Sequence, residues 1–384
     1  MTRLQHRPIT IFTPSDGSAS NTNAQNLTVK EVVARLPQEQ FHVTMLCEGD
    51  HPDPRLTARE NTRLVGWRKH GNTVRLLRHC LFPPPDIYFF PRSGPLDRIF
   101  LDTRKRMGLR TALITYIVMA MDEVTGTGLV GRSVWEGDRV FGNSKHVAAT
   151  IRRMFGVEAG VIYDGIDRHY YFADKNKNKD EYDGSDNGKD EYRERGGNAA
   201  PVVLYAGSLQ PRKRVELVIE EAARLPGMQF RIAGKGPTEK QCRDLARQRG
   251  CRNVSFLGHL SSEKLGEEMR QADIFFFPSI LEGNPQVLLQ AGACGLACVA
   301  MDRYRSDYVV DGRTGVLAGS DAELSNGLNR LASDAQLRRS FSEAAVRHVK
   351  QFDWDEIAGQ WAAVFQEAAA KRHPYRQPKA SCFF

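Results

Sequence analysis

The sequence predicts an α/β protein made of two Rossmann-like domains, each a doubly wound parallel sheet with helices on both faces. Three observations lead to this prediction. The chain has 384 residues, which is long for one hydrophobic core and sufficient for two. Short apolar runs alternate with segments of helical periodicity, as in repeated βαβ units. This rhythm stops once, over residues 174–200, and then begins again. Because such sheets bind ligands at the carboxyl ends of their strands, we expect the two domains to face each other across a cleft.

The first domain is predicted to contain six buried strands separated by helices. The apolar runs lie at residues 9–14, 42–48, 62–67, 86–91, 111–120 and 138–144. They are nearly continuous rather than alternating, which is typical of parallel strands covered on both faces.

Residues 174–200, DKNKNKDEYDGSDNGKDEYRERGGNAA, have no apolar periodicity. Lys-Asp-Glu-Tyr occurs at 179–182 and again at 189–192. Such a segment cannot bury enough apolar surface to offset its ordering entropy, so we predict a disordered linker insertion. The predicted organisation is therefore a first domain over 1–173, the linker over 174–200, a second domain over 201–352, and a C-terminal helix over 353–384 that crosses back to the first domain.

The second domain repeats the pattern. Its predicted strands lie at 201–209, 228–234, 253–259, 273–279, 296–301 and 314–319, and three helical segments follow at 321–332, 334–350 and 353–371.

The composition is that of a soluble globular protein, with 41% hydrophobic and 26% charged residues. No apolar run is long enough for a secretory signal or a membrane span. The seven cysteines are scattered and form no CxxC pair, which favours reduced thiols over disulfides or a zinc site. We therefore expect a cytoplasmic protein, with peripheral association at the inner face of the membrane as an alternative.

The net charge of +8 is concentrated in the first part of the chain. Two basic concentrations occur there, Arg68, Lys69, Arg75 and Arg78, and then Arg104, Lys105, Arg106 and Arg110. Solvated helix faces explain them most simply. An alternative is attraction to anionic lipid or to a phosphate-bearing acceptor. Nucleic acid is not expected as a partner, because no basic motif interleaved with aromatic residues is present.

The segment EGNPQVLLQAGACG, 282–295, keeps polar groups in an otherwise small and apolar stretch. It follows a predicted strand end. Asn284 suits a helix N-cap and Pro285 the first helical position, and Gln286 and Gln290 share one helix face. The N-terminus of such a helix suits a phosphate, and Glu282 can accept hydrogen bonds from sugar hydroxyls. An ordinary capped helix with one exposed acid remains an alternative.

The segment AGSLQPRKRVELVIEEA, 206–222, places Arg212, Lys213 and Arg214 at the start of a predicted helix. Cations there oppose the helix dipole and call for an anion, which a diphosphate would supply. A solvated basic turn is the simpler alternative.

Three further patterns are weaker. Gly234 and Gly236 in AGKGPTEK form a GxG after a strand, which a tight turn alone would explain. The first strand-to-helix loop, 15–23, is rich in small residues. The Asp-Trp-Asp at 353–355 has the form of a metal motif, but it opens the last helix, where Asp is a natural cap, so no metal is expected.

Taken together, these motifs resemble the retaining glycosyltransferases of family 4, which have the GT-B fold. The resemblance covers residues 8 to about 371 except the insertion, and it is strongest over 201–319. AGSLQPRKRVELVIEEA resembles the family's Gly-rich turn with its Lys, and FPSILEGNPQVLLQAGACGLACVA resembles its Glu-x7-Glu segment. The segment VIYDGIDRHYYF resembles the hinge of the family. The segments YVVDGRTGVLA and FDWDEIAGQW resemble the last elements of the family fold.

The resemblance implies a nucleotide-sugar donor held by the second domain and an acceptor held by the first. Lys213, helped by Arg212, would neutralise the diphosphate in place of a metal, and Glu282 would hold sugar hydroxyls as the third catalytic candidate. The implied donor-binding residues are Gly17, Ser208, Gly234, Lys235, Gly236, Phe256, Leu257, Gly258, Gly283, Asn284, Pro285, Gln286 and Gln290. Candidates for the acceptor, which would be a carbohydrate, glycolipid or small molecule, are Tyr116, Asp122 and Glu123.

Several positions depart from the family pattern. Gln290 stands for the second Glu, which weakens the expected ribose contact, and Ser208 stands where an Arg is usual. Gly17-Ser18 replaces a Gly-Gly pair, and the segment 114–126 lacks the usual His. Two other functions therefore remain open: a catalytically degenerate GT-B protein that acts as a nucleotide-binding partner subunit, and a nucleotide-sugar epimerase or phosphorylase.

Overall fold

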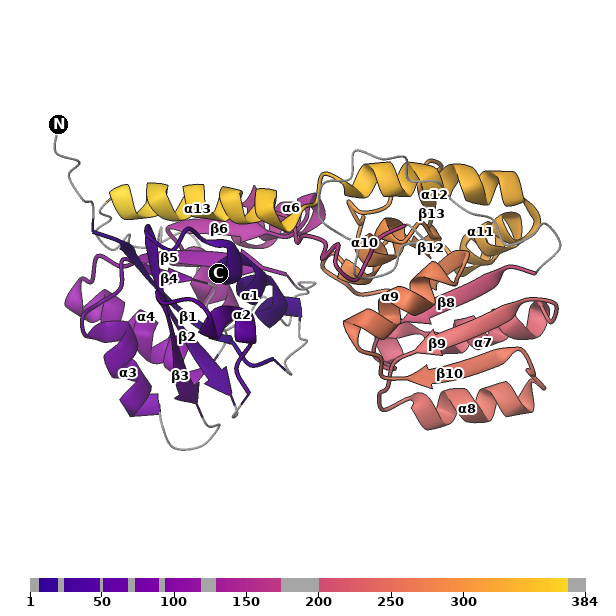
Figure 1. Ribbon diagram of the computed structural model, residues 1–384, viewed down its shortest axis with the longest axis horizontal. Helices are drawn as coiled ribbons and strands as arrows, with labels where there is room; N and C mark the ends of the chain where they lie inside the picture. The colour runs from indigo at the N-terminus through magenta and orange to yellow at the C-terminus, as the bar shows by residue number, and fades with distance from the viewer. Residues whose placement is uncertain are drawn as a thin grey trace. The chain divides into compact units, whose positions relative to one another are not determined.

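The computed structural model describes residues 7–19, 24–48, 51–67, 73–89, 94–118, 129–173 and 200–371. The chain divides into two compact units. Unit 1 comprises Met1–Gly165 and Trp354–Phe384, and unit 2 comprises Ile166–Asp353 (Figure 1).

Unit 1 is built on a parallel sheet of strand order β3-β2-β1-β4-β5-β6-β7. Its strands are β1 (Ile9–Asp16), β2 (Phe41–Glu48), β3 (Thr62–Trp67), β4 (Ile87–Phe89), β5 (Ala112–Ile117), β6 (Arg139–Gly142) and β7 (Gly160–Val161). The first six confirm the predicted strands. The strand β7 was not predicted, because two residues are too few to produce a recognisable apolar run.

The helices of unit 1 cover both faces of this sheet. They are α1 (Ala24–Arg35), α2 (Pro54–Thr57), α3 (Thr73–Leu81), α4 (Pro95–Met107), α5 (Leu129–Trp135), α6 (Lys145–Phe155) and α13 (Trp354–Ala370). Successive residues of β1 serve the two faces: Ile11 packs in a core with α1 and α13, and Phe12 packs in a core with α3 and α4. This is the side-chain alternation of a strand buried on both sides.

The C-terminal helix α13 lies along the sheet of unit 1 (Figure 1). Its Trp361 is fully buried, and the indole contacts the rings of Phe89, Tyr116, Phe141 and Phe365. Burial of aromatic surface of this size is among the largest single contributions to a core.

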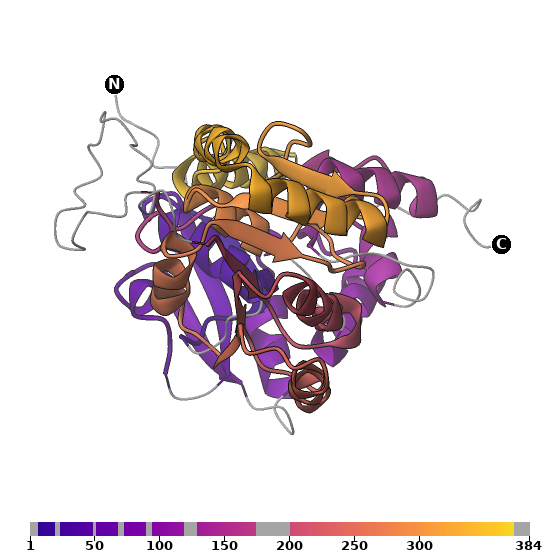
Figure 2. The same ribbon diagram turned by 90° about the vertical axis from the view of Figure 1, so that its right-hand side faces the viewer.

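Unit 2 contains a second parallel sheet, of order β10-β9-β8-β11-β12-β13, with helices on both sides (Figure 2). Its strands are β8 (Val202–Ala206), β9 (Gln229–Ala233), β10 (Val254–Gly258), β11 (Ile274–Phe277), β12 (Ala297–Met301) and β13 (Gly315–Ala318). Its α-helices are α7 (Val215–Arg224), α8 (Glu239–Gln248), α9 (Ser262–Arg270), α10 (Gln286–Ala293), α11 (Asp321–Ser333) and α12 (Ala335–Val349), and a 3₁₀ turn, η2, spans Pro211–Lys213. The predicted doubly wound class is confirmed for both units.

The first domain boundary needs correction, because residues 166–173 belong to unit 2 and not to the first domain. The backbone N–H of Ile166 donates to the carbonyl of Phe352 at 2.8 Å. Arg270 donates to the carbonyl of Tyr170 at 2.8 Å, and its guanidinium lies 4.3 Å from the ring centroid of Phe172. These contacts join two segments that are distant in sequence, so local patterns could not reveal them. Apart from Ala200, the predicted linker over 174–200 lies outside the described residues.

Candidate functional site

The strand order of unit 2 reverses between β8 and β11, the two strands at the centre of its sheet. In doubly wound sheets this reversal opens a crevice at the carboxyl ends of the two strands, where ligands bind. The loop after β8 leads into η2, and the loop after β11 leads into α10. The two loops are joined directly, because the backbone N–H of Ile280 donates to the carbonyl of Arg212 at 3.1 Å.

Three donors from these loops converge on a single carboxylate oxygen, Oε1 of Glu282. Lys213 Nζ lies at 2.6 Å, Arg212 Nη1 at 2.8 Å and Ser279 Oγ at 2.5 Å. The side chains of Lys213 and Glu282 are 10% and 11% exposed, and that of Arg212 is 38% exposed. Two cations thus share one carboxylate, which leaves an excess of positive charge at the edge of the sheet.

The ammonium group of Lys213 sits in a largely apolar place. It lies 4.9 Å from the centroid of the Phe277 ring, at the end of β11. Burial lowers the pKa of Lys213, and the Glu282 carboxylate opposes this shift. A buried lysine with a single carboxylate partner gains from a further anion, because an anion would repay part of the desolvation cost.

The turn between Glu282 and α10 differs from the prediction at one residue. The helix is capped by Pro285, whose φ of −69° and ψ of 112° are those of a residue still outside the helix. Asn284 is therefore not the N-cap. Its side-chain oxygen instead accepts a hydrogen bond from Ser306 Oγ at 2.8 Å. The N-cap residue Pro285 makes no side-chain capping hydrogen bond, and the start of a helix presents backbone N–H groups that suit an anion. Gly283, Asn284 and Pro285 are buried within this turn.

Gln286 and Gln290 occupy the same face of α10 and are both half-buried. The amide nitrogen of Gln286 is buried and makes no hydrogen bond with the described part of the chain. The expected contact of Gln290 with a ribose stays a prediction.

The glycines of the GxG segment have a structural explanation. Gly234 has a φ of 141°, and a Cβ atom on it would lie 1.9 Å from the carbonyl oxygen of Gly207. A Cβ on Gly236 would lie 2.3 Å from the carbonyl oxygen of Leu209. Only glycine allows the two loops to pack this closely. The GxG segment thus positions the loop that carries Ser208 and leads to Lys213, and direct contact with a ligand stays a prediction.

The residues expected near a nucleotide base lie at the carboxyl ends of β9 and β10. Lys235 Cε is 3.6 Å from the place a Cβ on Gly258 would occupy. The guanidinium of Arg243 lies 4.5 Å from the ring centroid of Phe256, so one face of that ring is occupied. Phe256 and Leu257 are half-buried.

The candidate residues of unit 1 are distant in the sequence from the residues that converge on Glu282. Gly17 follows β1, and its N–H donates to the carbonyl of Leu46 at 2.8 Å. Tyr116 is 2% exposed, and its hydroxyl donates to the carbonyl of Ile162 at 2.8 Å within the core. Its role toward an acceptor stays a prediction. Asp122 and Glu123 lie outside the described residues.

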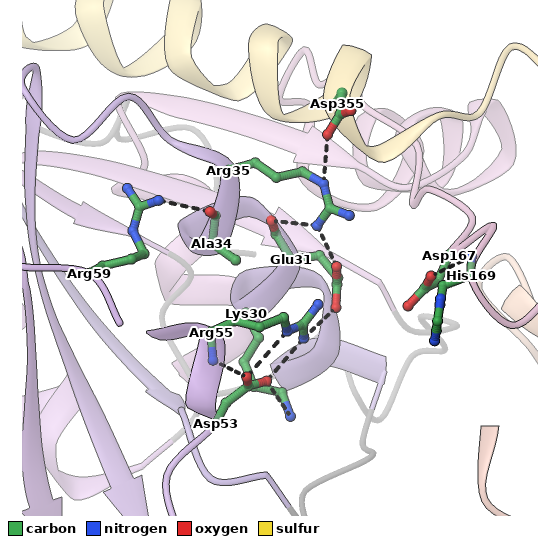
Figure 3. Close-up of polar contacts among 10 residues, drawn as sticks. All are labelled: Lys30, Glu31, Ala34, Arg35, Asp53, Arg55, Arg59, Asp167, His169 and Asp355. Atoms are coloured by element: carbon green, nitrogen blue, oxygen red, sulfur yellow. Dashed lines mark hydrogen bonds and ion pairs between the residues drawn. The ribbon is translucent and has the colours of Figure 1, made fainter. Parts of the chain in front are cut away.

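Sequence reasoning missed a group of charged side chains in unit 1, near the carboxyl ends of β1 and β2 (Figure 3). Lys30 Nζ lies 3.9 Å from Asp53, and Arg55 bridges Asp53 at 3.0 Å and Glu31 at 2.7 Å. Arg35 joins Glu31 of α1 to Asp355 of α13. In the sequence, Lys30 and Glu31 look like an ordinary exposed pair on α1, and only the fold shows that both are buried.

Comparisons with known proteins place this geometry in context. Residues 189–348, all within unit 2, match the family described as glycosyl transferases group 1. Two solved structures resemble nearly the whole chain. An Anabaena protein, HepE, in complex with UDP has a TM-score of 0.71 at 17% identity, covering 94% of this chain and 100% of that chain. WaaG, a glycosyltransferase involved in lipopolysaccharide biosynthesis, has a TM-score of 0.67 at 18% identity. The match covers 93% of this chain and 99% of WaaG. The chain has the GT-B fold.

Curated relatives share only part of their length with this GT-B protein. An exopolysaccharide phosphotransferase of Streptomyces coelicolor is 31% identical over 196 residues, which are 48% of this chain and 21% of the relative. A D-inositol 3-phosphate glycosyltransferase of Mycobacterium tuberculosis is 32% identical over 189 residues, 46% of this chain and 39% of the relative. The chain therefore spans less than half the length of these relatives.

Among the described residues of the GT-B protein, no group of three or more His, Cys, Asp or Glu side chains could hold a metal ion. The two carboxylates of the Asp-Trp-Asp segment are each paired with an arginine. Asp353 lies 3.3 Å from Arg168, and Asp355 lies 2.8 Å from Arg35.

The second basic cluster, which begins at Arg104, has fewer exposed side chains than the sequence indicated. Arg104 is fully buried, where it pairs with Asp138 and donates to the carbonyl of Thr111 at 2.9 Å. It faces neither solvent nor a membrane, because its position on α4 turns inward. Lys105, Arg106 and Arg110 are exposed. Over the described residues, no helix has the length and apolar character needed to cross a bilayer.

Proposed function

We propose that the protein is a retaining glycosyltransferase, which moves a hexose from a nucleoside diphosphate sugar to a carbohydrate, glycolipid or small-molecule acceptor without a divalent metal. The observation that carries this proposal is the convergence of Lys213, Arg212 and Ser279 on Glu282 at the strand reversal of unit 2. The match of this unit to glycosyl transferases group 1 and the UDP-glucose complex of the Anabaena protein support the donor class.

The proposed chemistry follows from the charges at this site. The leaving group of the reaction is a nucleoside diphosphate, on which negative charge develops as the glycosidic bond breaks. Lys213 and Arg212 are fixed cations that would stabilise this charge, together with the N–H groups at the start of α10. Glu282 would accept hydrogen bonds from hydroxyls of the donor sugar, and Gln290 would contact the ribose.

Binding of the donor requires an exchange of partners. In the structure both cations are held by the Glu282 carboxylate. A diphosphate carries more negative charge than one carboxylate, so it competes well for the same two cations. The exchange frees Glu282 to face the sugar.

The first experiment is a thermal-shift panel with UDP, GDP, ADP and dTDP and their sugars. At a ligand concentration 100 times the dissociation constant, the expected stabilisation is about 2.7 kcal/mol. The second is hydrolysis of the selected donor by wild type, Lys213→Ala and Glu282→Ala, with Glu343→Ala as a control on an exposed glutamate. Loss of hydrolysis in Lys213→Ala and Glu282→Ala, but not in Glu343→Ala, supports the proposal. No shift with any nucleotide would contradict it.

A second candidate is a GT-B protein that binds a nucleotide without turnover. Gln290 and Ser208, which stand where the family has charged residues, favour it. Saturable nucleotide binding without hydrolysis or transfer, even with acceptor extracts, would select this candidate.

A further inference from the structure

Tyr304 presents an unexplained feature of unit 2. It follows β12, the strand next to β11, and is 2% exposed. Its hydroxyl is buried and has no hydrogen-bond partner within the described part of the chain. An unpaired buried hydroxyl destabilises the folded state, and a phenylalanine would fill the same space without this cost. The presence of tyrosine instead of phenylalanine at position 304 therefore needs a functional explanation.

Two contacts place Tyr304 beside the Glu282 site. The loop that carries it is fastened to the turn after Glu282, because Ser306 Oγ donates to Asn284 Oδ1 at 2.8 Å. The ring of Tyr304 packs edge-on against Phe277, with centroids 6.4 Å apart, and Phe277 is the ring that also contacts Lys213. Burial, and then the nearby Glu282 carboxylate, hold the pKa of Tyr304 well above its ordinary value, so the hydroxyl remains a hydrogen-bond donor.

When a diphosphate replaces Glu282 as the partner of the two cations, the Glu282 carboxylate needs another hydrogen-bond donor. Once a diphosphate draws Lys213 and Arg212 away, Ser279 alone of the three donors to Glu282 Oε1 remains. A nearly buried carboxylate that loses its cations is costly unless other donors replace them. A neutral hydroxyl can replace them without competing for the diphosphate.

We propose that Tyr304 is a positioning residue, whose hydroxyl donates a hydrogen bond to the Glu282 carboxylate when a nucleoside diphosphate sugar occupies the site. This role rests on the proposed function. Tyr304 keeps the carboxylate charged and oriented toward the sugar, and Glu282 makes the contact with the substrate. In the structure the Glu282 carboxylate is held by the two cations, and the Tyr304 hydroxyl has no partner among the described residues.

The test uses Tyr304→Phe in the full chain, which removes one oxygen atom and keeps the ring. With UDP alone, we expect affinity within about twofold of wild type, because the diphosphate contacts Lys213 and Arg212. With UDP-glucose, we expect kcat for donor hydrolysis to fall about tenfold, the effect of one hydrogen bond to a charged group. Tyr308→Phe, a buried tyrosine in the same segment, serves as the matched control and should leave kcat unchanged.

A double-mutant cycle separates positioning from a general structural effect. In the Glu282→Gln background, Tyr304→Phe should cause no further loss, because the charge that it positions is already absent. An unchanged kcat in Tyr304→Phe would overturn the role of Tyr304, and so would an equal loss in both backgrounds. If wild type binds UDP but does not turn over, the readout is the gain in affinity from UDP to UDP-glucose, which Tyr304→Phe should reduce. If wild type binds neither, the proposed function fails, and the role of Tyr304 fails with it.

Discussion

The carboxyl edges of the two sheets both carry buried lysines, but the charges around these lysines differ. In unit 1, Lys30 and Arg55 face the carboxylates of Asp53 and Glu31, so positive and negative charges balance. In unit 2, Lys213 and Arg212 share the single carboxylate of Glu282.

The difference indicates what each group does. In unit 1 the ion pairs connect helices: Arg55 links α2 to α1, and Arg35 links α1 to α13 (Figure 3). Because the charges of this group balance, it has little net attraction for a further ion. A group with more cations than carboxylates retains attraction for an anion. Both lysines are buried, so it is the count of charges around them, and not burial, that favours an anion site in unit 2.

The largest expected effect comes from exchanging Lys213 for methionine, with Lys30→Met in unit 1 as the comparison. Lys213→Met should weaken binding of a nucleoside diphosphate about 100-fold, because it removes a nearly desolvated cation from the anion site. Lys30→Met should leave this affinity nearly unchanged, because the Lys30 ammonium lies beside the Asp53 carboxylate in unit 1. Isothermal titration calorimetry measures both constants. A larger loss of nucleotide affinity in Lys30→Met than in Lys213→Met would assign the anion site to unit 1.

The next effect concerns the close packing of the two loops at the edge of unit 2. Gly234→Ala should lower the free energy of unfolding by on the order of 2 kcal/mol and weaken nucleotide binding, because its Cβ would collide with the Gly207 carbonyl. Gly227→Ala is the matched control, since nothing lies within 4 Å of its Cβ position. Urea denaturation provides the measurement. Equal stability of the two variants would show that the loops are not packed in this way.

A smaller effect distinguishes paired from unpaired tyrosine hydroxyls. Tyr88 and Tyr304 are both buried, but the Tyr88 hydroxyl donates to Asp97 at 2.7 Å. Tyr88→Phe should cost about 1–3 kcal/mol of unfolding free energy, because it leaves a buried carboxylate short of a donor. Tyr304→Phe should be neutral or slightly stabilising in the absence of ligand. A loss of similar size in Tyr304→Phe would mean that its hydroxyl already has a partner.

The smallest effect is a dependence of nucleotide affinity on pH. Because the pKa of Lys213 is lowered from 10.5, the folded protein loses this proton at a pH where the unfolded chain still holds it. Between the lowered pKa and 10.5 the unfolded state binds more protons, so this group makes unfolding less favourable as pH rises. Nucleotide affinity should fall over the same interval, by at most about tenfold per pH unit, as the cation is lost. Lys213→Arg should remove this dependence, since guanidinium does not deprotonate, and an equal slope in both proteins would assign it to another group.

Much of the fold could be predicted, because each strand of the two sheets is a short apolar run that stands out from its neighbours. The predicted and observed bounds of β3 are the same, 62–67, and the other predicted strands differ by a few residues at their ends. The two-residue β7 could not be found in this way. The N-cap of α10 was placed one residue early, because Asn284 is a good cap by type and its tertiary contact with Ser306 was not visible in the sequence.

The two parallel-sheet units, and Lys213 and Glu282 as residues of interest, could be predicted from local patterns, since helix and strand periodicity and helix-end chemistry are local properties. Three features depend on long-range packing: Arg212 meets Glu282 across 70 positions of the chain, Arg104 turns inward, and the Tyr304 hydroxyl is buried without a partner among the described residues. The physical reason is that strand order and register bring loops together, and no local pattern records which loops will become neighbours.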